Sequence, residues 1–442
     1  MELFFHLAEQ LGITEDKDIA ELADVSVENV SNWRSGAVQE FKPQKLRSIK
    51  TRLAALIASL EEQAGVVPSD TNANLSPLEV EAGSGPADLQ RQFRDRVAYD
   101  YLGHRFLYYE PMGALAWENL IKRGYDQDRW LSGVNGCISS WMDRRRDADG
   151  STKGPLAEAL GMTRRGTATG LDLVSLGPGE GDKEVHIVKQ FLSAESEWDH
   201  RYPWLAYMPV DVSIPLLLVA ARNARSAFRE LAGRSRATTY QVRPFCADFE
   251  EGVLDFTKRL PPSLHSEHAG LRLVLMLGNV FGNLRDEEVF CRERLSALVR
   301  PGDLLWVEVG LRLDPLDKDP LYRMTRPDHD ESAAEANRRL LLEGPYRRWE
   351  AATGRSSSDL ELRVWVREDD DTSRIPGSVN FCHDLVIKDE RRVCTMLYSR
   401  RYEVSSLTTW LERQGFDVLR IQRVEDSRNQ PRVAHLLLRR RG

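Results

Sequence analysis

The sequence predicts an α/β protein with a mostly parallel sheet, preceded by a separate all-helical unit. From about residue 170 onward, short apolar runs of strand length alternate with longer helical segments, and this alternation is typical of parallel sheets covered by helices. Residues 64–88 are rich in Gly, Pro, Ser and Asn and have no hydrophobic periodicity. They predict a flexible linker between the helical unit and the α/β region.

Composition narrows the class of protein. The 442 residues are 41% hydrophobic and 29% charged, which suits a globular chain of two or three domains. The net charge of −7 offers no general attraction to nucleic acids or acidic membranes. No apolar run reaches the length of about 18 residues that a membrane span requires.

The cysteines and the first residues predict the compartment. The five cysteines are odd in number and include no CxxC pair, and no His, Cys or carboxylate cluster has the spacing of metal ligands. The N-terminal residues lack the basic segment and cleavage site of a secretory signal. We therefore expect a cytoplasmic protein with reduced thiols and no metal site.

Residues 1–63 are expected to form a small helical domain. Apolar residues recur at the spacing of a two-helix core, at Ile19, Leu22, Val25, Val30 and Trp33. With the turn DVSV between the two helices, the segment resembles the repressor-like helix-turn-helix family. The resemblance implies that the second helix presents Glu28, Asn29 and Asn32 outward, as a recognition helix does.

The charge of this unit leaves its partner open. Residues 1–63 contain eleven acidic and seven basic residues, whereas DNA affinity depends on neutralising phosphates. The unit is expected to bind either DNA or a protein, and the acidic balance favours protein interaction or dimerisation.

A glycine-rich loop follows the first expected strand, LDLVSL at 171–176. Gly177, Gly179 and Gly181 allow a sharp turn and the close approach of a ligand to the backbone. A helix beginning near Asp182 would direct its N–H groups at that ligand. The spacing G-x-G-x-G is neither the dinucleotide fingerprint nor a phosphate-binding P-loop. The loop alone indicates either a ligand cradle or an ordinary tight turn.

Acidic residues follow the next two expected strands. Asp211 stands where YMPVDVS ends its strand, and it could accept hydrogen bonds from both ribose hydroxyls or cap the next helix. In FCADFEEG, Asp248 could accept from an adenine amino group while Phe249 packs against the ring. The alternatives are a turn acid and a core phenylalanine.

Five stretches in this order resemble the class I S-adenosylmethionine-dependent methyltransferases. They are SLGPGEGDKE, YMPVDVS, CADFE, LGNVFGNL and VRPGD. More narrowly, they resemble the histidine-specific Nα-methyltransferase family of the ergothioneine pathway. The resemblance implies a Rossmann-like sheet that ends in an antiparallel hairpin, with adenosylmethionine as the cofactor. The cofactor-binding residues that it implies are Gly177, Gly179 and Gly181 of the loop, Asp211, Asp248 and Phe249.

The resemblance also divides the region after the linker. Residues 166–310 would form the cofactor-binding core, which 403–442 completes, and 311–402 would be a substrate-binding insertion. Residues 89–165, with aromatic clusters such as VAYDYLGHRFLYYE, are predicted to be helical and to belong to the substrate-binding part.

The acceptor residues come from the same resemblance. Asn283, Tyr322 and Ser399 match family positions that bind the acceptor, the first two at its α-amino and carboxylate groups. Family members that bind imidazole have a glutamate two residues before the serine, and here that position is Leu397. A leucine cannot accept a hydrogen bond from imidazole, so selectivity for histidine should be lost.

The sequence therefore predicts an adenosylmethionine-dependent N-methyltransferase that acts on an amino acid or a related amine, and not on histidine. The reaction would be an in-line displacement that depends on proximity and orientation, and no general base is assigned. A lone histidine, His383, is expected to be structural. The alternative is a DNA-binding regulator whose methyltransferase-like domain senses adenosylmethionine. DNA methylation is disfavoured because no [DNS]-P-P-[YFW] sequence occurs.

Overall fold

The computed structural model divides the chain into two compact units, Met1–Thr71 and Asn72–Gly442. Within the part of the chain that the structure describes, no helix is long and apolar enough to cross a membrane. The described residues are 5, 15–23, 25–35, 49, 73–96, 101–109, 113–117, 127–141, 154–160, 170–198, 204–232, 239–258, 270–319, 345, 348–350, 353, 354, 356–368, 373–425 and 431–442.

Two short helices, α2 (Asp16–Ala23) and α3 (Val27–Arg34), lie in the first unit. Ser26 caps α3, because its hydroxyl accepts the backbone N–H of Asn29 at 3.3 Å. Arg34 of α3 pairs with Asp16 of α2 at 2.7 Å. The two helices share one apolar cluster, formed by Ile19, Ala20, Ala23, Val30 and Ile49, with Phe5, Val25 and Trp33 partly buried against it.

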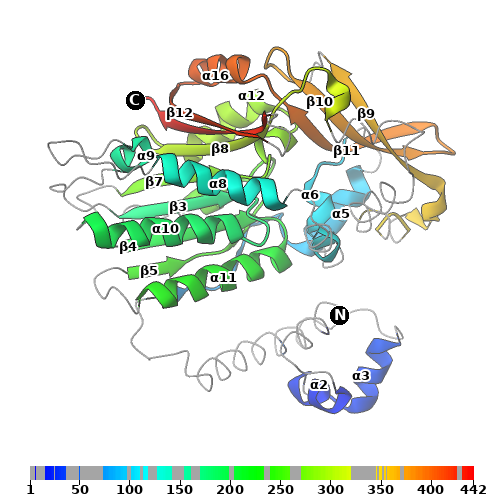
Figure 1. The fold of residues 1–442 in the computed structure, drawn as a ribbon. Helices are drawn as coiled ribbons and strands as arrows, with labels where there is room; N and C mark the ends of the chain where they lie inside the picture. The colour runs from blue at the N-terminus through cyan, green and yellow to red at the C-terminus, as the bar shows by residue number, and fades with distance from the viewer. Residues whose placement is uncertain are drawn as a thin grey trace, which may run out of the picture. The chain divides into compact units, whose positions relative to one another are not determined.

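The second unit contains the predicted mostly parallel sheet (Figure 1). Its strand order is β1-β5-β4-β3-β7-β8-β13-β12. All neighbours from β1 to β8 are parallel, and the antiparallel hairpin of β12 and β13 completes the edge beside β8. The strands are β1 (Ala73–Leu75), β3 (Leu171–Leu176), β4 (Trp204–Asp211), β5 (Thr239–Val242), β7 (Leu271–Met276), β8 (Leu304–Gly310), β12 (Phe416–Glu425) and β13 (Pro431–Arg440).

The linker prediction for residues 64–88 is wrong from residue 73 onward. The short strand β1 pairs with β5, and β2 (Glu79–Val80) pairs with β6 (Phe245–Cys246). Backbone bonds hold the segment, including Ser76 N–H to the Val242 carbonyl at 2.9 Å. Strands of two or three residues gain their stability from main-chain hydrogen bonds, so they need no hydrophobic periodicity, and the Gly and Pro residues mark the turns between them.

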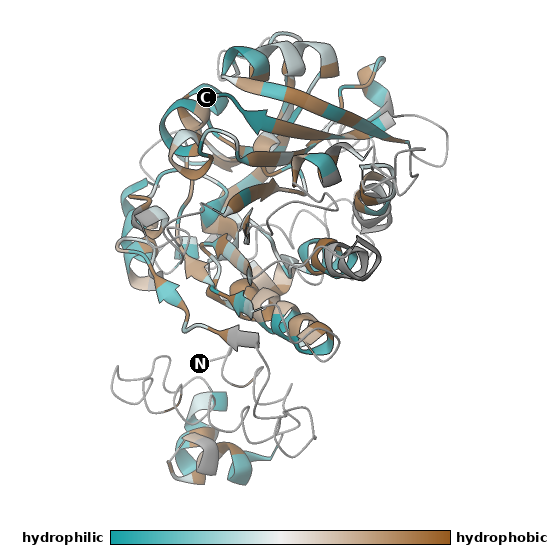
Figure 2. Cartoon of the chain, turned by 90° about the vertical axis from the view of Figure 1, so that its left-hand side faces the viewer, coloured by the Kyte–Doolittle hydropathy of each residue, from teal (hydrophilic) through white to brown (hydrophobic). Residues whose placement is uncertain are grey.

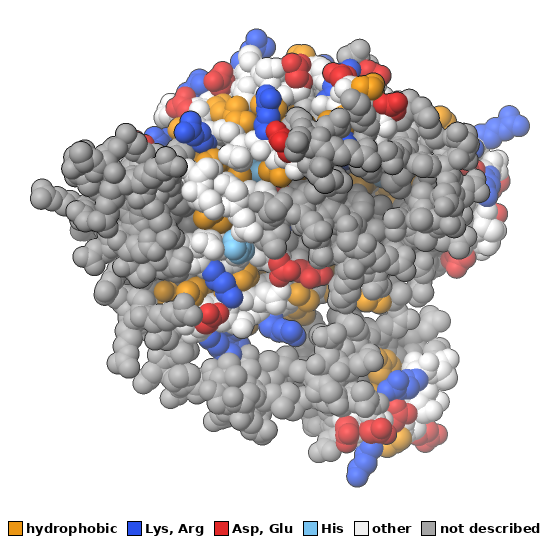
Figure 3. Space-filling view, viewed as in Figure 1, with side chains coloured by type: hydrophobic (Ala, Val, Ile, Leu, Met, Phe, Trp, Pro, Cys, Tyr) orange, Lys and Arg blue, Asp and Glu red, His pale blue; other side chains and the backbone are white. Residues whose placement is uncertain are grey.

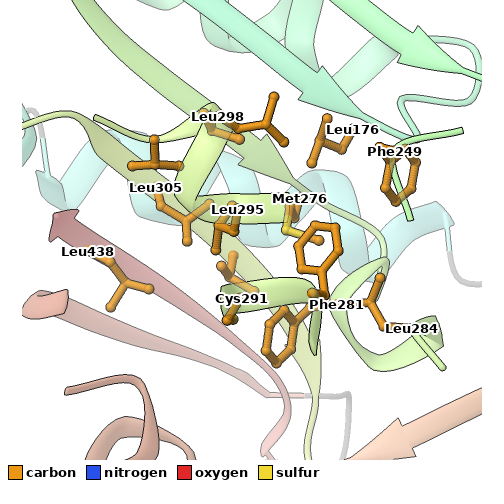
Figure 4. Packing of buried hydrophobic residues seen from close by; sticks show 14 of the residues in the cluster. Leu176, Phe249, Met276, Phe281, Leu284, Cys291, Leu295, Leu298, Leu305 and Leu438 are labelled. Atoms are coloured by element: carbon orange, nitrogen blue, oxygen red, sulfur yellow. The ribbon is translucent and has the colours of Figure 1, made fainter. Parts of the chain in front are cut away.

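Alternate residues of β3 face opposite sides of the sheet. Leu171 and Leu173 pack in a cluster with helices α8, α10 and α11, whereas Val174 and Leu176 pack in a second cluster that includes α16. Every residue of β3 is buried, as expected for a parallel strand covered on both faces. Figure 4 shows Leu176 of the second cluster near Phe249, and in Figure 2 brown predominates in the strands at the centre of the unit.

Figure 1 shows α8, α10 and α11 running along one face of the sheet. The helices of the second unit are α5 (Pro86–Arg96), α6 (Arg105–Tyr108), α8 (Gln127–Trp141), α9 (Pro155–Ala159), α10 (Asp182–Trp198), α11 (Ile214–Ala232), α12 (Glu287–Val289), α13 (Ser296–Leu298) and α16 (Val404–Arg413). A π-helical segment, Phe290–Leu295, connects α12 and α13.

The helices α8 and α9 do not follow the prediction that assigned all of 89–165 to the substrate-binding part. Trp141 of α8 lies 4.8 Å from Trp306 of β8, measured between ring centroids. Cys137 and Leu156 are buried in the same cluster as the strands of the large sheet. Their apolar faces therefore cover the cofactor-binding core, which the helical pattern alone could not distinguish from any other apolar surface.

A second, three-stranded antiparallel sheet lies within residues 311–402, in the order β11-β10-β9. Its strands are β9 (Leu360–Glu368), β10 (Val379–Ile387) and β11 (Arg392–Arg401). The end of β11 is joined to the carboxyl end of β8, because Tyr402 N–H donates to the Gly310 carbonyl at 3.0 Å. The helices α5 and α6 pack on this sheet through an apolar cluster that contains Phe93, Phe106 and Met396.

Candidate cofactor and acceptor site

The three loop glycines all have positive φ angles, of 64° at Gly177, 59° at Gly179 and 76° at Gly181. A side chain at Gly177 would meet Val280 at 3.1 Å, and one at Gly181 would meet Ala220 at 3.0 Å. Both the backbone conformation and the close packing therefore require glycine. The loop leads from β3 into the N-terminus of α10, whose free N–H groups favour an anionic or polar ligand.

Lys183 is a functional candidate that the sequence analysis missed. Its ammonium lies 3.4 Å from the carboxylate of Glu308 on β8, which also accepts the Gly278 N–H at 2.9 Å. Burial raises the pKa of Glu308 to about 7, although Lys183 opposes this shift. The cation beside the glycine loop suits the carboxylate of an amino acid moiety, and a lysine directly after a glycine loop was the available signal.

Asp211 lies at the carboxyl end of β4 and is buried. The helix α11 begins at Ile214, and the side chain at its N-terminal boundary is Ser213, whose hydroxyl accepts the Leu216 N–H at 3.5 Å. Asp211 lies two residues before Ser213 and accepts the Ser213 N–H at 2.9 Å. Burial raises its pKa to about 6. The capping hydroxyl at the start of α11 thus comes from Ser213, and ribose binding by Asp211 stays a prediction.

Asp248 is held from two sides. Its Oδ1 atom accepts the backbone N–H groups of Glu250 and Glu251, each at 3.0 Å. Its Oδ2 atom forms an ion pair with Arg105 of α6, and its own N–H donates to the Ser84 hydroxyl at 3.1 Å. Ser84 and Arg105 come from the segment before the core, so the sequence analysis did not connect them with Asp248.

Phe249 is buried at the same edge of the sheet. Its ring lies 6.3 Å from that of Phe290 and 6.2 Å from that of His104, between centroids. A side chain built at Gly177 would come within 3.8 Å of it. Phe249 is therefore both a core residue and a neighbour of the glycine loop, so the two sequence interpretations are compatible.

Two further buried groups lie beside Asp248 and Phe249. Burial raises the pKa of Glu250 to about 8, while a hydrogen bond from the Arg285 N–H opposes the shift. The His104 ring nitrogen Nδ1 is 3.5 Å from the Glu250 carboxylate, and burial lowers the pKa of His104. The surroundings of Asp248 and Phe249 thus contain titratable groups that are uncharged near neutral pH.

The acceptor candidates meet at Asn279, which follows β7 with a φ angle of 63°. Its Nδ2 atom donates to Asn283 Oδ1 at 3.3 Å and to the Ser399 hydroxyl at 3.5 Å, and its Oδ1 atom accepts the Gly310 N–H at 2.9 Å. The structure thus brings Asn283 and Ser399 together through a residue that the sequence analysis missed. Tyr322 lies outside the described residues.

Leu397 lies on β11 two residues before Ser399 and pairs with His383 of β10. It is buried in the apolar cluster that β11 forms with α5 and α6. His383 is buried as well. The structure therefore shows Leu397 as a buried apolar residue of β11, and its place beside the acceptor stays a prediction.

Trp117 extends the site from the segment before the core. Its indole nitrogen lies 3.5 Å from the position that a side chain on Gly179 would take. Its ring packs edge-on against Tyr108 at 5.4 Å between centroids. Trp117 thus reaches the glycine loop, which the sequence analysis did not foresee.

The N-terminal candidates Glu28, Asn29 and Asn32 are exposed on α3. On the face of the molecule shown in Figure 3, acidic and basic side chains of the described residues are interspersed. The visible described surface therefore has no extended patch of one sign of charge.

Part of the second unit is similar to a known family. The family model described as histidine-specific methyltransferase, SAM-dependent, matches residues 156–318, which run from α9 past the end of β8. A comparison with curated proteins found no match.

Several solved methyltransferases are similar at low identity. One is an S-adenosylmethionine-dependent methyltransferase from Clostridium acetobutylicum, at 11% identity over 74% of this chain and 98% of that chain, with a TM-score of 0.32. The 1,6-didemethyltoxoflavin-N1-methyltransferase of Burkholderia thailandensis is 12% identical over 74% and 88%, with a TM-score of 0.33. The glycopeptide N-methyltransferase MtfA is 13% identical over 70% and 97%, with a TM-score of 0.27.

The glycine loop, the two acids at the neighbouring strand ends and the family match define an S-adenosylmethionine-dependent methyltransferase, and S-adenosylmethionine is its cofactor. Within that class, residues 156–318 are similar to the histidine-specific methyltransferases. The matched stretch ends before β9, so it contains neither Leu397 nor Ser399.

Proposed function

We propose that the protein methylates the amino nitrogen of an amino acid or a related amine, and that histidine is not its preferred acceptor. The observation that carries the proposal is the hydrogen-bonded group of Asn279, Asn283 and Ser399 next to the apolar Leu397. Amide and hydroxyl groups can orient an α-amino group by hydrogen bonds. Arg401 donates a further hydrogen bond to the Ser399 hydroxyl at 3.0 Å.

The cofactor residues have separate roles in this proposal. Asp211 would accept hydrogen bonds from the ribose, and Asp248 would accept one from the adenine amino group. Gly177, Gly179 and Gly181 would let the methionyl part lie against the backbone, with Lys183 beside its carboxylate. These positions follow the edge of the sheet from β6 through β4 to β3, which suits an extended ligand.

Bound adenosylmethionine supplies an electrophilic methyl group. The acceptor amine must be neutral to attack it, and a C–N bond forms as the C–S bond breaks. The protein residues then act mainly by holding the amine in line and excluding water. The methylated amine releases its proton to solvent.

Two observations weigh against histidine as the preferred methyl acceptor. The family match covers the cofactor core and ends at residue 318, before the residues that would contact the acceptor side chain. In the family that the sequence resembles, a glutamate precedes the serine by two residues, and here a buried leucine takes that place. A site without a partner for imidazole loses the discrimination that a hydrogen bond provides.

A methyl-transfer assay over a panel of acceptors tests the proposal. Purified protein is incubated with methyl-labelled adenosylmethionine and single amino acids, amines or short peptides, and initial rates are compared. We expect at least one amine other than histidine to be methylated faster than histidine. A clear preference for histidine over the whole panel would contradict the selectivity argument and leave the methyltransferase assignment intact.

For the first unit we propose a helix-turn-helix domain that binds a protein partner. The exposed Glu28, Asn29 and Asn32 on α3 support an outward-facing second helix. The excess of acidic over basic residues in 1–63 weighs against phosphate binding. Titration of the isolated unit with duplex DNA at low salt tests this, and binding that weakens steeply with salt would contradict it.

A further inference from the structure

We infer that Arg105, which comes from the segment before the methyltransferase core, is a positioning residue that makes the cofactor site selective for adenine. The inference rests on the proposed contact between Asp248 and the adenine amino group. It adds a residue that lies 143 positions away in the chain and outside the stretch that the family model matches.

The hydrogen bonds of Asp248 leave little freedom. A carboxylate has about four acceptor positions. Oδ1 accepts two backbone N–H groups, from Glu250 and Glu251. Oδ2 accepts from Arg105. Among the described residues no further hydrogen bond to Oδ2 is formed, which leaves one acceptor position on this atom for an amino group of the base.

Because Asp248 is buried, its carboxylate needs a partner of opposite charge, and the Arg105 guanidinium is that partner. The side chains of Arg105 and Asp248 are 8% and 7% exposed, and an isolated carboxylate at this depth would be costly. Arg105 also pairs with Glu251 at 2.9 Å, and its guanidinium lies 4.8 Å from the Phe106 ring centroid. Three contacts hold its guanidinium in place, so it can balance the charge of the Asp248 carboxylate and keep it in one rotamer.

This arrangement distinguishes adenine from its deaminated form. Adenine presents an N–H donor to Oδ2, whereas hypoxanthine presents a carbonyl oxygen, which an ionised carboxylate repels. If Asp248 took up a proton or turned away, the site could accept either base. Arg105 should therefore control the preference between the two bases, in addition to any effect on stability.

The test compares the dissociation constants of S-adenosylhomocysteine and S-inosylhomocysteine by calorimetry. For the unmodified protein we expect a preference for the adenine ligand on the order of 10²-fold. Asp248→Asn should reduce this preference to about twofold, because an amide can donate as well as accept. Arg105→Gln should reduce it by about tenfold or more.

Arg96→Gln is the matched control. Arg96 also pairs with Glu251. Among the ion pairs of the described residues, Asp248 is paired with Arg105 and not with Arg96. The ratio of the two dissociation constants should stay unchanged in this variant. A loss of the ratio in Arg96→Gln as well would mean that Glu251, and not Asp248, mediates the effect, which would overturn the inference.

The variants distinguish the role of Arg105 from the proposed contact between Asp248 and adenine. If Asp248→Asn removes the preference and Arg105→Gln weakens both ligands equally, Arg105 is merely structural and the inference is wrong. If Asp248→Asn leaves the preference intact, the adenine contact itself is misplaced. Should Arg105→Gln fail to fold, Arg105→Lys replaces it. One ammonium cannot meet both carboxylates as the guanidinium does, so an unchanged ratio in Arg105→Lys also overturns the inference.

Discussion

The side-chain amide of Asn279 donates a hydrogen bond to the Ser399 hydroxyl at 3.5 Å, and 120 residues of chain separate the two positions. The contact joins the end of β7 to β11, and so connects the cofactor-binding sheet to the three-stranded sheet. It also places the neighbouring Asn283 on the same hydrogen-bonded group. The acceptor site we propose exists only because these two sheets meet.

Replacing Asn279 with Ala should damage acceptor binding more than cofactor binding. The change removes the partner that Asn279 supplies to the Gly310 N–H and to Asn283, while Ser399 keeps its hydrogen bond from Arg401. This loss costs about 1–3 kcal/mol. We expect kcat/KM for the best acceptor to fall by about 10- to 100-fold, since about 1.4 kcal/mol is tenfold. The dissociation constant of adenosylmethionine should change little. Asn29→Ala, in the first unit, is the control, and equal losses in both ligands would place Asn279 outside the acceptor site.

Cofactor affinity should depend on pH through Asp211, whose pKa burial raises to about 6. The ionised carboxylate is the form that accepts hydrogen bonds from ribose hydroxyls. Binding should therefore weaken as pH falls through about 6, by up to about tenfold per pH unit below it. Calorimetry between pH 5 and 8 measures this, and Asp211→Asn should bind weakly with a flat profile over the same range. A pH-dependent profile in Asp211→Asn would assign the titration to another group.

The substitution Asp211→Asn should also make the ligand-free protein more stable at alkaline pH. The folded pKa of Asp211 lies above its usual value, so its contribution to stability is present below about pH 4 and is lost as pH rises through about 6. At pH 8, Asp211→Asn should raise the free energy of unfolding by up to about 2–3 kcal/mol, an upper limit from the two-unit shift. Denaturant unfolding at pH 8 and pH 5 checks the sign. A variant that is less stable at pH 8 would show that the hydrogen bond to the Ser213 N–H outweighs the cost of burial.

Replacing Leu397 with Glu should create activity toward histidine. The new carboxylate would stand two residues before Ser399, at the position where the resembled family has its imidazole partner. We expect the rate with histidine to rise by about tenfold or more, because one charged hydrogen bond is worth about 1.5–3 kcal/mol. Leu397→Gln is the matched control of similar shape and should gain less. Since burying a glutamate costs stability, thermal unfolding must first show that both variants fold. No gain in a folded Leu397→Glu would mean that β11 does not face the acceptor side chain.

Deleting residues 1–71 should leave cofactor binding nearly unchanged. The first compact unit ends at Thr71, and the proposed site residues all lie in the second unit. The cap on the adenine edge, from Ser84 to Arg105, is retained in this deletion. Binding to any partner of the helical unit should disappear. Loss of adenosylmethionine binding in a folded deletion variant would show that the first unit completes the site, and a longer deletion to residue 109 should abolish binding in any case.

The sequence by itself determined the cofactor side of this protein. The loop Gly177–Gly181 follows β3, Asp211 ends β4 and Asp248 follows β6. Parallel strands bring their carboxyl ends to one edge whatever the rest of the chain does. Local order was therefore enough to predict the α/β class. The cofactor and the hairpin of β12 and β13 came from the resemblance of five short stretches to a known family, and the structure contains the hairpin.

Only the tertiary structure decided which distant residues complete the site. Ser84 and Arg105 reach Asp248 because a segment read as a linker pairs with β5 and β6. Asn279 meets Ser399 because β11 joins the end of β8. No periodicity or local motif encodes such contacts, since they depend on how short main-chain pairings close long loops and bring polar side chains into one buried space.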